Sequence, residues 1–256
     1  MAQANLPTGN SPQRTRQAWS VLIVSTFAFT VCFMVWMMFG VIGIPIKKML
    51  NLNSTQFGLL MSMPVLTGSL VRVPLGIWTD KFGGRIVMAA VMATTVPAIW
   101  LMGYATEYWH FLTIGLFVGL AGGSFSVGTP YVARWFPKHR QGTAMGVYGA
   151  GNSGAAVNKF VAPVLLVAFG WTMVPQVYAA IMLGTVVLFW LFSHSDPSHL
   201  VPSNVSFMDQ LKALKDPKVL KYCQYYSIVF GGYVALSLWM VQYYVGEFGL
   251  DIRVAA

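Results

Sequence analysis

The sequence has very few charged residues. They make up 9% of its 256 residues, against about 25% in an average soluble domain. Hydrophobic residues make up 56%, so most of the chain must face lipid or other apolar helices. The composition excludes an ordinary soluble domain and predicts an all-α integral membrane protein. The net charge of +9 then belongs to loops, where it sets orientation and gives no support for nucleic-acid binding.

Cysteine and histidine are also scarce. Cys32 and Cys223 lie in separate apolar runs, which gives no disulfide framework. The four histidines are scattered at the ends of apolar runs and in polar segments, without the spacing of a metal site. No Ser–His–acid set and no phosphate-binding loop is present. We therefore expect no catalytic residue, no metal and no cofactor, and an enzyme is the least favoured class.

Long apolar runs are abundant. A membrane-spanning helix needs about 20 apolar residues, and seven stretches satisfy this: 18–44, 55–79, 85–105, 109–133, 142–168, 171–193 and 218–246. We expect a disordered cytoplasmic tail at 1–17, a six-helix bundle at 18–194, a cytoplasmic connector at 195–217 and a seventh helix within 218–256. The segment SFMDQLKALKD in the connector predicts a short amphipathic helix along the membrane surface.

The basic residues are unequally divided between the two sides. Eleven fall on the side of the amino terminus and three on the other. The positive-inside rule then places the amino terminus in the cytoplasm. We expect the protein to lie in the cell's inner, or plasma, membrane.

No span contains a deeply placed Asp or Glu, and only two cations, Arg72 and Lys159, lie well inside apolar runs. An arginine in hydrocarbon costs several kcal/mol unless it faces a polar cavity or a partner. With no carboxylate to pair with it, Arg72 is predicted to bind an anion, and its planar guanidinium suits a planar oxyanion. Lys159 lies beyond the midplane and is expected to extend toward the outer interface.

Phe125 and Asn152 are predicted to lie at a depth similar to that of Arg72, and Tyr226 is predicted to lie somewhat shallower. A rise of 1.5 Å per helical residue, counted from the nearest basic anchor, puts Arg72 near the midplane and Asn152 about 18 Å deep. Phe125 comes out at about 13 Å and Tyr226, less deep, at about 8 Å. Transporters bind substrate near this level, although the aromatic residues also suit a helix core and Asn152 a bond across helices.

Small residues recur about every fourth position between Gly115 and Ala156. Gly115, Gly119 and Gly123 mark one helix face; Gly142, Gly146 and Ala150 mark another. This spacing lets helix backbones approach closely in lipid.

The hinge GIWTDKFGGR after the second span resembles the loop motif of the major facilitator superfamily. The matching residues are Gly76, Asp80, Lys81, Gly83 and Arg85, with Gly84 where a second base is often found. The resemblance implies a cytoplasmic gate, in which Asp80 pairs with bases and lies near the positive end of a neighbouring helix.

The stretch GSFSVGTPYVARWFPKHRQGTAMGVYGAGNSGAA is similar to the fourth and fifth helices of the nitrate/nitrite porter family. It includes a glycine-rich signature, whose Gly149, Gly151 and Gly154 are expected to pack helices. The resemblance implies a major-facilitator-type six-helix bundle plus a seventh transmembrane helix, with the second bundle missing. We expect the sequence to be a fragment of a longer protein rather than a truncated, inactive product.

The same resemblance implies roles for four residues. Arg72 corresponds to a nitrate-binding arginine, Phe125 to an aromatic that stacks on the substrate, and Asn152 to the asparagine of the signature. Tyr226 corresponds to a seventh-helix tyrosine that bonds the anion, with the adjacent Tyr225 as the alternative match. The expected partners are nitrate, nitrite and the lipid bilayer.

The resemblance leaves the mode of transport open. The absence of an intramembrane carboxylate favours nitrate/nitrite exchange by alternating access, and nitrate/proton symport stays open. A facilitator for another small anion or solute is a second hypothesis. A seven-span receptor or sensor is a third; the Asp80 hinge and the cytoplasmic amino terminus argue against it.

Overall fold

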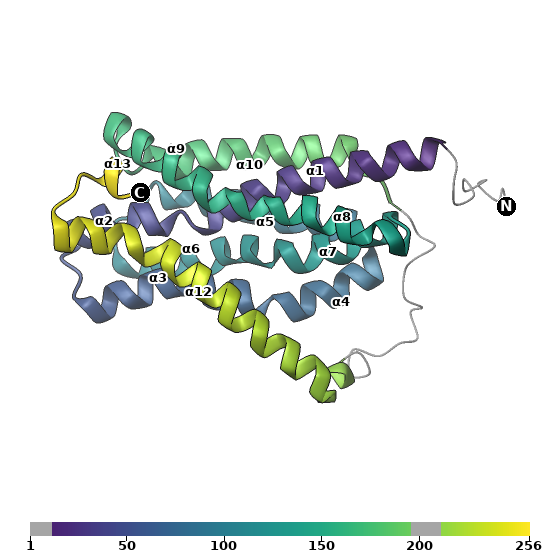
Figure 1. Ribbon diagram of the computed structural model, residues 1–256. Coiled ribbons are helices and arrows are strands. Elements are labelled where there is room, and N and C mark those ends of the chain that lie inside the picture. Colours follow the sequence, from purple (N-terminus) through teal and green to yellow (C-terminus); the bar gives the residue numbers. More distant parts are fainter. Residues whose placement is uncertain (1–11, 196–210) are drawn as a thin grey trace.

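A computed structural model describes residues 12–195 and 211–256, and all regular structure in these two segments is helical (Figure 1). Seven apolar stretches are long enough to cross a membrane: Pro12–Met49, Ser54–Phe82, Gly84–Met102, Tyr108–Trp135, Lys138–Phe169, Met173–Phe192 and Pro217–Phe248. They coincide with the seven predicted spans, because hydropathy over about 20 residues is a strong signal. The protein is therefore a multi-pass membrane protein.

Four of the seven spans are interrupted, which the sequence did not predict. The first consists of α1 (Pro12–Trp36) and α2 (Phe39–Met49), and the second of α3 (Ser54–Leu70) and α4 (Arg72–Phe82). Short 3₁₀ segments divide the other two: η1 (Gly119–Gly123) separates α6 (Tyr108–Val118) from α7 (Ser124–Trp135), and η2 (Ala150–Ser153) separates α8 (Lys138–Gly149) from α9 (Gly154–Phe169). The two remaining bundle helices, α5 (Gly84–Met102) and α10 (Met173–Phe192), are continuous.

The interruptions coincide with predicted site residues. Arg72 is the first residue of α4, Phe125 is the second residue of α7, and Asn152 lies within η2. The glycine run of η1 and the Gly-Asn pair of η2 are poor helix formers, which explains the local change to 3₁₀ geometry.

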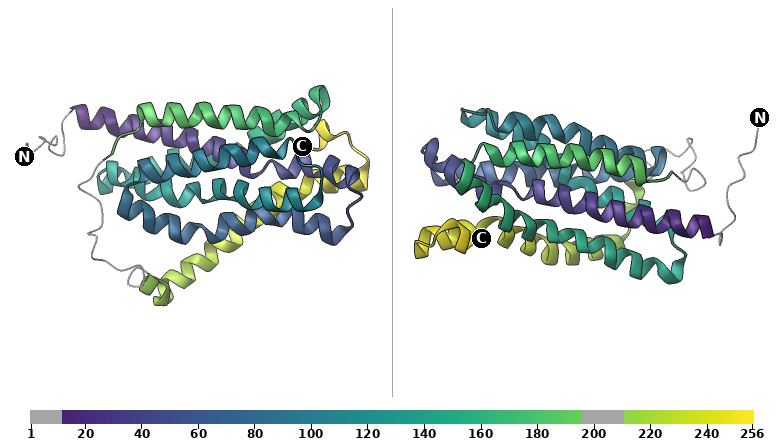
Figure 2. Two further views of the ribbon diagram at one scale, coloured as in Figure 1. Left: turned by 180° about the vertical axis from the view of Figure 1, so that it is seen from behind. Right: turned by 90° about the horizontal axis from the view of Figure 1, so that it is seen from above.

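Helix α1 is the centre of the bundle. It contacts α7, α8, α9 and α10, and its side chains are buried along most of its length. Figure 2 shows α1 running beside α10, and the Ser20 hydroxyl donates to the Phe192 carbonyl near their ends. A long apolar helix without a polar face is expected in this position.

Glycine allows η2 and α9 to approach α1. A Cβ added at Gly151 would lie 2.3 Å from the Phe29 ring, and one at Gly154 would lie 2.1 Å from the Thr30 carbonyl oxygen. The packing role expected for these two glycines therefore agrees with the geometry. Gly149 differs, because an added Cβ there meets nothing within 4 Å, and the same holds for Gly142 and Gly146. Their side of α8 has no partner in the described residues.

This contrast gives a stability prediction for the full-length protein. Gly154→Ala should lower its stability by about 1–3 kcal/mol, because the methyl group overlaps the α1 backbone. Gly184→Ala in α10 is the matched control, since its added Cβ meets nothing within 4 Å. Thermal unfolding of the detergent-purified protein measures the difference. Equal unfolding temperatures for the two variants would contradict the packing argument.

The seventh span, α12 (Pro217–Phe248), contacts the bundle along only part of its length. Its buried residues, Val234, Ser237, Leu238 and Val241, all lie in the second half of the helix. Figure 1 shows the helix close to α2 and α3 at that end and diverging from α4 at its beginning. Two short elements flank it, η4 (Lys212–Lys215) and α13 (Ile252–Ala255).

The structure describes only parts of the predicted tail and connector. Helix α1 begins at Pro12, so residues 12–17 are helical. The predicted boundary of the disordered tail at residue 17 is therefore wrong. Proline is well tolerated in the first turn of a helix, and a helix can continue into water beyond its apolar run. Residues 1–11 and 196–210 lie outside the described residues, and the second range includes 206–210, the first five residues of the predicted amphipathic segment. The rest of that segment contains η4.

Candidate functional site

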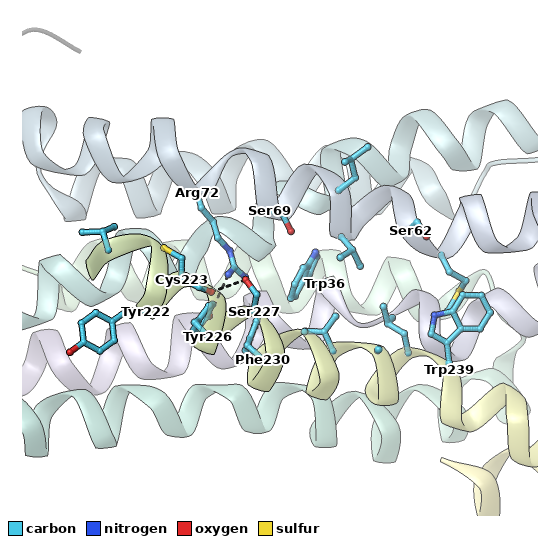
Figure 3. Close-up of a pocket in the computed structure, with 18 residues that line it drawn as sticks. Trp36, Ser62, Ser69, Arg72, Tyr222, Cys223, Tyr226, Ser227, Phe230 and Trp239 are labelled. Atoms are coloured by element: carbon cyan, nitrogen blue, oxygen red, sulfur yellow. Dashed lines mark hydrogen bonds between the residues drawn. The ribbon is translucent and has the colours of Figure 1, made fainter. Parts of the chain in front are cut away.

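Arg72 lies at the break between α3 and α4, and its half-buried side chain extends toward α12 (Figure 3). Its Nη1 donates to the Tyr226 hydroxyl at 3.3 Å. The guanidinium carbon lies 5.0 Å from the ring centroid of Phe230, 5.9 Å from that of Trp36 and 6.0 Å from that of Tyr226. Aromatic faces attract a cation at these distances, but they do not neutralise it.

The charge of Arg72 has no acidic partner in the part of the chain that the structure describes. Among these residues the ion pair found is that of Arg134 with Asp80, at the far end of α4. The Arg72 Nε is buried and has no hydrogen-bond partner in the same residues. A buried donor without a partner is costly, so this guanidinium is suited to receive an acceptor from outside the chain.

A run of nearly parallel aromatic rings lies beside the guanidinium. Phe125 and Tyr226 have ring centroids 6.3 Å apart and planes inclined by 17°. Tyr226 and Phe230 are 5.0 Å apart at 14°, and Phe230 and Trp36 are 6.4 Å apart at 10°. The rings come from α1, α7 and α12, so three helices present flat apolar faces to one place.

Packing fixes the orientation of Trp36. Its indole Nε1 donates to the Pro64 carbonyl at 2.8 Å. A Cβ at Gly68 or Gly122 would lie within 2.8 Å of the indole, so both positions require glycine. The ring is therefore held rigidly beside Arg72.

Arg72 and three of these aromatic residues line a cavity of about 1090 Å³ between α3, α4 and α12. Its polar lining comes from Ser62, Ser69, Ser227 and Arg72, and the remaining lining is mostly apolar or aromatic, with Trp36, Tyr226 and Phe230 among it. A mostly apolar cavity with a few converging polar groups is the usual form of a small-molecule site. Tyr225 is exposed and does not line the cavity, so the geometry favours Tyr226 over its neighbour.

Asn152 is not brought to this cavity. Its Nδ2 donates to the Gly149 carbonyl at 2.8 Å, within its own helix, and its Oδ1 is buried without a partner in the described residues. Its backbone carbonyl accepts a 3.1 Å hydrogen bond from the Tyr233 hydroxyl of α12. Phe125 does not line the cavity either but reaches it through its stack with Tyr226. Lys159 is half-buried on α9 and is absent from the cavity lining.

Three residues near Arg72 and Asn152 were not predicted from the sequence: Trp36, Phe230 and Tyr233. Phe230 and Tyr233 lie four and seven residues after Tyr226 on α12, and this spacing places them on the same helix face. That periodicity was therefore an available signal. Trp36 sits in a continuous apolar run, and nothing in the sequence distinguishes it from a core residue.

The predicted loop motif forms a set of contacts at the end of the bundle where α4, α7 and α10 end, hereafter the basic end. Arg134 Nη2 donates to Asp80 Oδ1, which links the last turn of α7 to α4. Gly83 ends α4 with φ of 87°, a conformation that favours glycine. A Cβ at Gly84 would lie 2.2 Å from the Tyr131 Cβ, so close packing accounts for glycine where a base is often found.

The expected contact of Asp80 with the positive end of a neighbouring helix is not found in the described residues. Its partner is a base in the carboxyl-terminal turn of α7, where a cation is favoured by the negative end of the helix dipole. Lys81 is half-buried, and Gly76 has open space around it.

Arg85 connects α5 to the end of α10. Its Nη2 donates to the Trp190 carbonyl at 2.7 Å, and its guanidinium carbon lies 4.4 Å from the Trp190 ring centroid. Burial lowers the pKa of His194 below its ordinary value, and the positive charge of Arg85 lowers it further.

With this geometry in view, a family model described as Major Facilitator Superfamily matches residues 24–256. The chain belongs to the major facilitator superfamily. This membership confirms the predicted fold class and argues against the seven-span receptor hypothesis.

Curated relatives are similar over almost the whole chain. A probable nitrate/nitrite antiporter, NarK1, of Thermus thermophilus is 39% identical over 96% of this chain and 57% of its own length. A nitrite extrusion protein of Bacillus subtilis is 32% identical over 90% of the chain and 58% of its length. A probable nitrate transporter, NarT, of Staphylococcus epidermidis is 31% identical over 91% and 59%. The resemblance predicted from the sequence is confirmed, and the chain spans less than two thirds of the length of these relatives.

Solved structures support the same fold. A bacterial homologue of the human lysosomal transporter Spinster, in an inward-facing, unoccupied conformation, matches with a TM-score of 0.71 and 19% identity. The match covers 96% of this chain and 58% of that one. The occupied form of that homologue matches with a TM-score of 0.73 and 18% identity.

Proposed function

We propose that this chain is part of a transporter for nitrate and nitrite that works by alternating access and not by enzymatic chemistry. The observation that carries the proposal is the Arg72 guanidinium, which borders a cavity beside parallel aromatic rings and has no acidic partner in the described residues. A guanidinium fork matches a planar oxyanion, and the aromatic faces suit its flat surface. The names of the relatives support nitrate and nitrite over other anions.

We assign roles to the site residues on this basis. Arg72 carries the charge that binds the anion, Tyr226 shares the hydrogen bonding, and Phe230, Trp36 and Phe125 provide the aromatic wall. Asn152 does not contact the anion in the conformation described. Asn152 remains a proposed site residue because its turn, η2, is joined to α12 by a hydrogen bond to the Asn152 carbonyl.

We propose nitrate/nitrite exchange as the mode of transport. In the described residues, each acid lies in the last turn of a helix or outside the helices. Proton-coupled transporters carry such acids within the membrane. Proton symport is the alternative, and a pH gradient applied in the experiment below separates the two.

The basic end is proposed to face the cytoplasm of a plasma-membrane protein whose amino terminus is inside. The positive-inside rule supports this, since Lys81, Arg85, Arg134, Lys138 and Arg140 all cluster there. The opposite end of the bundle, where α2 and α12 end, is called the outer end below. The bundle of residues 18–194 and the helix of 218–256 are assigned to two separate halves of the transporter.

Exchange can be measured directly with the full-length protein in liposomes loaded with nitrite. External nitrate should release nitrite in roughly one-to-one amounts, and nitrite release should not require an inward proton gradient. Chlorate should compete to some degree because it is also a monovalent oxyanion, while glucose should have no effect. Competition by glucose equal to that by nitrate, or release that depends wholly on the proton gradient, would contradict the proposed exchange.

The cavity contains a reporter of occupancy. Cys223 is exposed and lines the cavity, whereas Cys32 is buried. Nitrate should therefore slow the reaction of Cys223 with a small maleimide, and chloride at the same concentration should not. The Cys223→Ser variant identifies the labelled site. Equal labelling rates with and without nitrate would remove the assignment of this cavity to substrate.

A further inference from the structure

Helix α12 touches the bundle closely at the outer end. A Cβ added at Gly40 would lie 3.4 Å from the Leu238 Cα and the Leu238 carbonyl oxygen, so the two backbones are nearly in contact. The Trp239 and Phe57 rings pack edge to face with centroids 5.7 Å apart. These contacts pack α12 against α2 and α3 at the outer edge of the cavity, whose lining includes Leu238 and Trp239.

The cytoplasmic half of the same helix has few contacts. Tyr222 and Ile228 are 71% and 67% exposed, and Val229 is 76% exposed. Figure 1 shows this half of α12 diverging from α4. In the described residues, α12 therefore packs on the bundle toward the outer end and makes few contacts along its other half.

A polar contact lies between the packed half and the exposed half of α12. Tyr233 is seven residues after Tyr226 on α12, or about 10 Å along the axis. Its hydroxyl donates to the Asn152 carbonyl at 3.1 Å, and its ring stacks on that of Phe33 at 6.2 Å and 20°. This hydrogen bond joins α12 to η2, the turn that carries the glycine-rich signature.

We propose that Tyr233 is a positioning residue that couples outer closure to the substrate site. When α12 lies against α2, the Tyr233 hydroxyl holds the backbone of η2. When the outer end opens, α12 must leave α2, the hydrogen bond breaks, and the turn carrying Asn152 is released. The coupling rests on the proposed transport function, but the closure contact itself can be tested without substrate.

The Asn152 side chain moves together with the backbone carbonyl to which Tyr233 donates. Its Nδ2 is bound within its own helix, so the side chain moves with the backbone of the turn. Its Oδ1 is buried without a partner in the described residues. A small rotation of η2 therefore changes the direction in which that oxygen points.

The first test measures how often the outer end opens. Val241→Cys is made in the full-length protein with Cys223→Ser, because Val241 is buried on the face of α12 that meets the bundle. A membrane-impermeant maleimide is added from outside. Tyr233→Phe should raise the labelling rate about fivefold, which corresponds to a lost hydrogen bond of about 1 kcal/mol.

The matched control is Tyr243→Phe on the same helix. Tyr243 packs on Tyr244 and Phe248 and is exposed, so the loss of its hydroxyl should leave labelling unchanged. An unchanged rate for Tyr233→Phe, or an equal rise for Tyr243→Phe, would overturn the proposal. Neither outcome depends on whether nitrate is the substrate.

A second experiment covers the case in which Val241→Cys is poorly expressed. The pair Gly40→Cys and Leu238→Cys should cross-link on oxidation, because the two backbones are close enough for a disulfide. The cross-link should stop exchange, and a reductant should restore it. Tyr233→Phe should slow cross-linking, whereas unchanged cross-linking in that variant would overturn the coupling. If the unmodified protein does not exchange nitrate at all, only the proposed function fails.

Discussion

Replacing Arg72 with lysine should abolish nitrate/nitrite exchange by the full-length transporter while leaving it inserted and folded. Lysine keeps the positive charge but loses the planar fork that can bind an oxyanion in two places. It also loses the geometry in which Nη1 donates to Tyr226 while the buried Nε has no partner in the described residues. Hydrogen bonds to charged groups contribute about 1.5–3 kcal/mol each, so exchange should fall roughly a hundredfold or more.

The control for this prediction is the other intramembrane cation. Lys159→Gln removes a charge at membrane depth, but Lys159 does not line the cavity, so exchange should continue. Size-exclusion profiles of both variants show whether they fold. Full exchange by Arg72→Lys, or an equally inactive but well-folded Lys159→Gln, would mean that the anion is bound elsewhere.

The sequence alone was sufficient to predict the seven spans but not their interruptions. A span is recognised from the summed hydropathy of about 20 residues, and a local change at one residue such as Val71, at the junction of α3 and α4, does not alter that sum. The η1 and η2 breaks follow glycine-rich segments, but glycine also permits close helix packing. Gly151 and Gly154 pack against α1 while Gly149 meets nothing, and the sequence cannot distinguish them because the difference lies in which side faces α1.

The sequence predicted those features of the candidate site that depend on how deep a residue lies in the membrane. Counting residues from basic anchors put Arg72, Phe125 and Asn152 at similar depth, and the family resemblance added the shallower Tyr226. The structure places Arg72 and Phe125 beside Tyr226. Asn152 lies at a similar predicted depth, yet its side chain turns toward its own helix. Depth fixes the position along the membrane normal, but direction depends on helix rotation, which is set by tertiary packing. Trp36 reaches the site through such packing.

The second large effect is expected at the basic end, where Asp80 and Arg134 hold α4 to α7. Asp80→Asn removes the negative charge of this partly buried pair and should lower the exchange rate roughly tenfold, because breaking one partner of a buried pair leaves the other charge uncompensated. The apparent affinity for nitrate should change little. Asp80 lies eight residues after Arg72, or about 12 Å along the helix, and does not line the cavity.

A charge exchange between the two positions makes this test specific. The double variant Asp80→Arg with Arg134→Asp should recover part of the exchange that either single substitution loses, since the pair is restored with its partners reversed. Lys138→Gln is the control, because Lys138 is an exposed base in the same loop region. If the single substitutions act additively in the double variant, the two residues contribute independently. In that case Asp80 influences turnover through its charge at the cytoplasmic surface and not through its contact with α7.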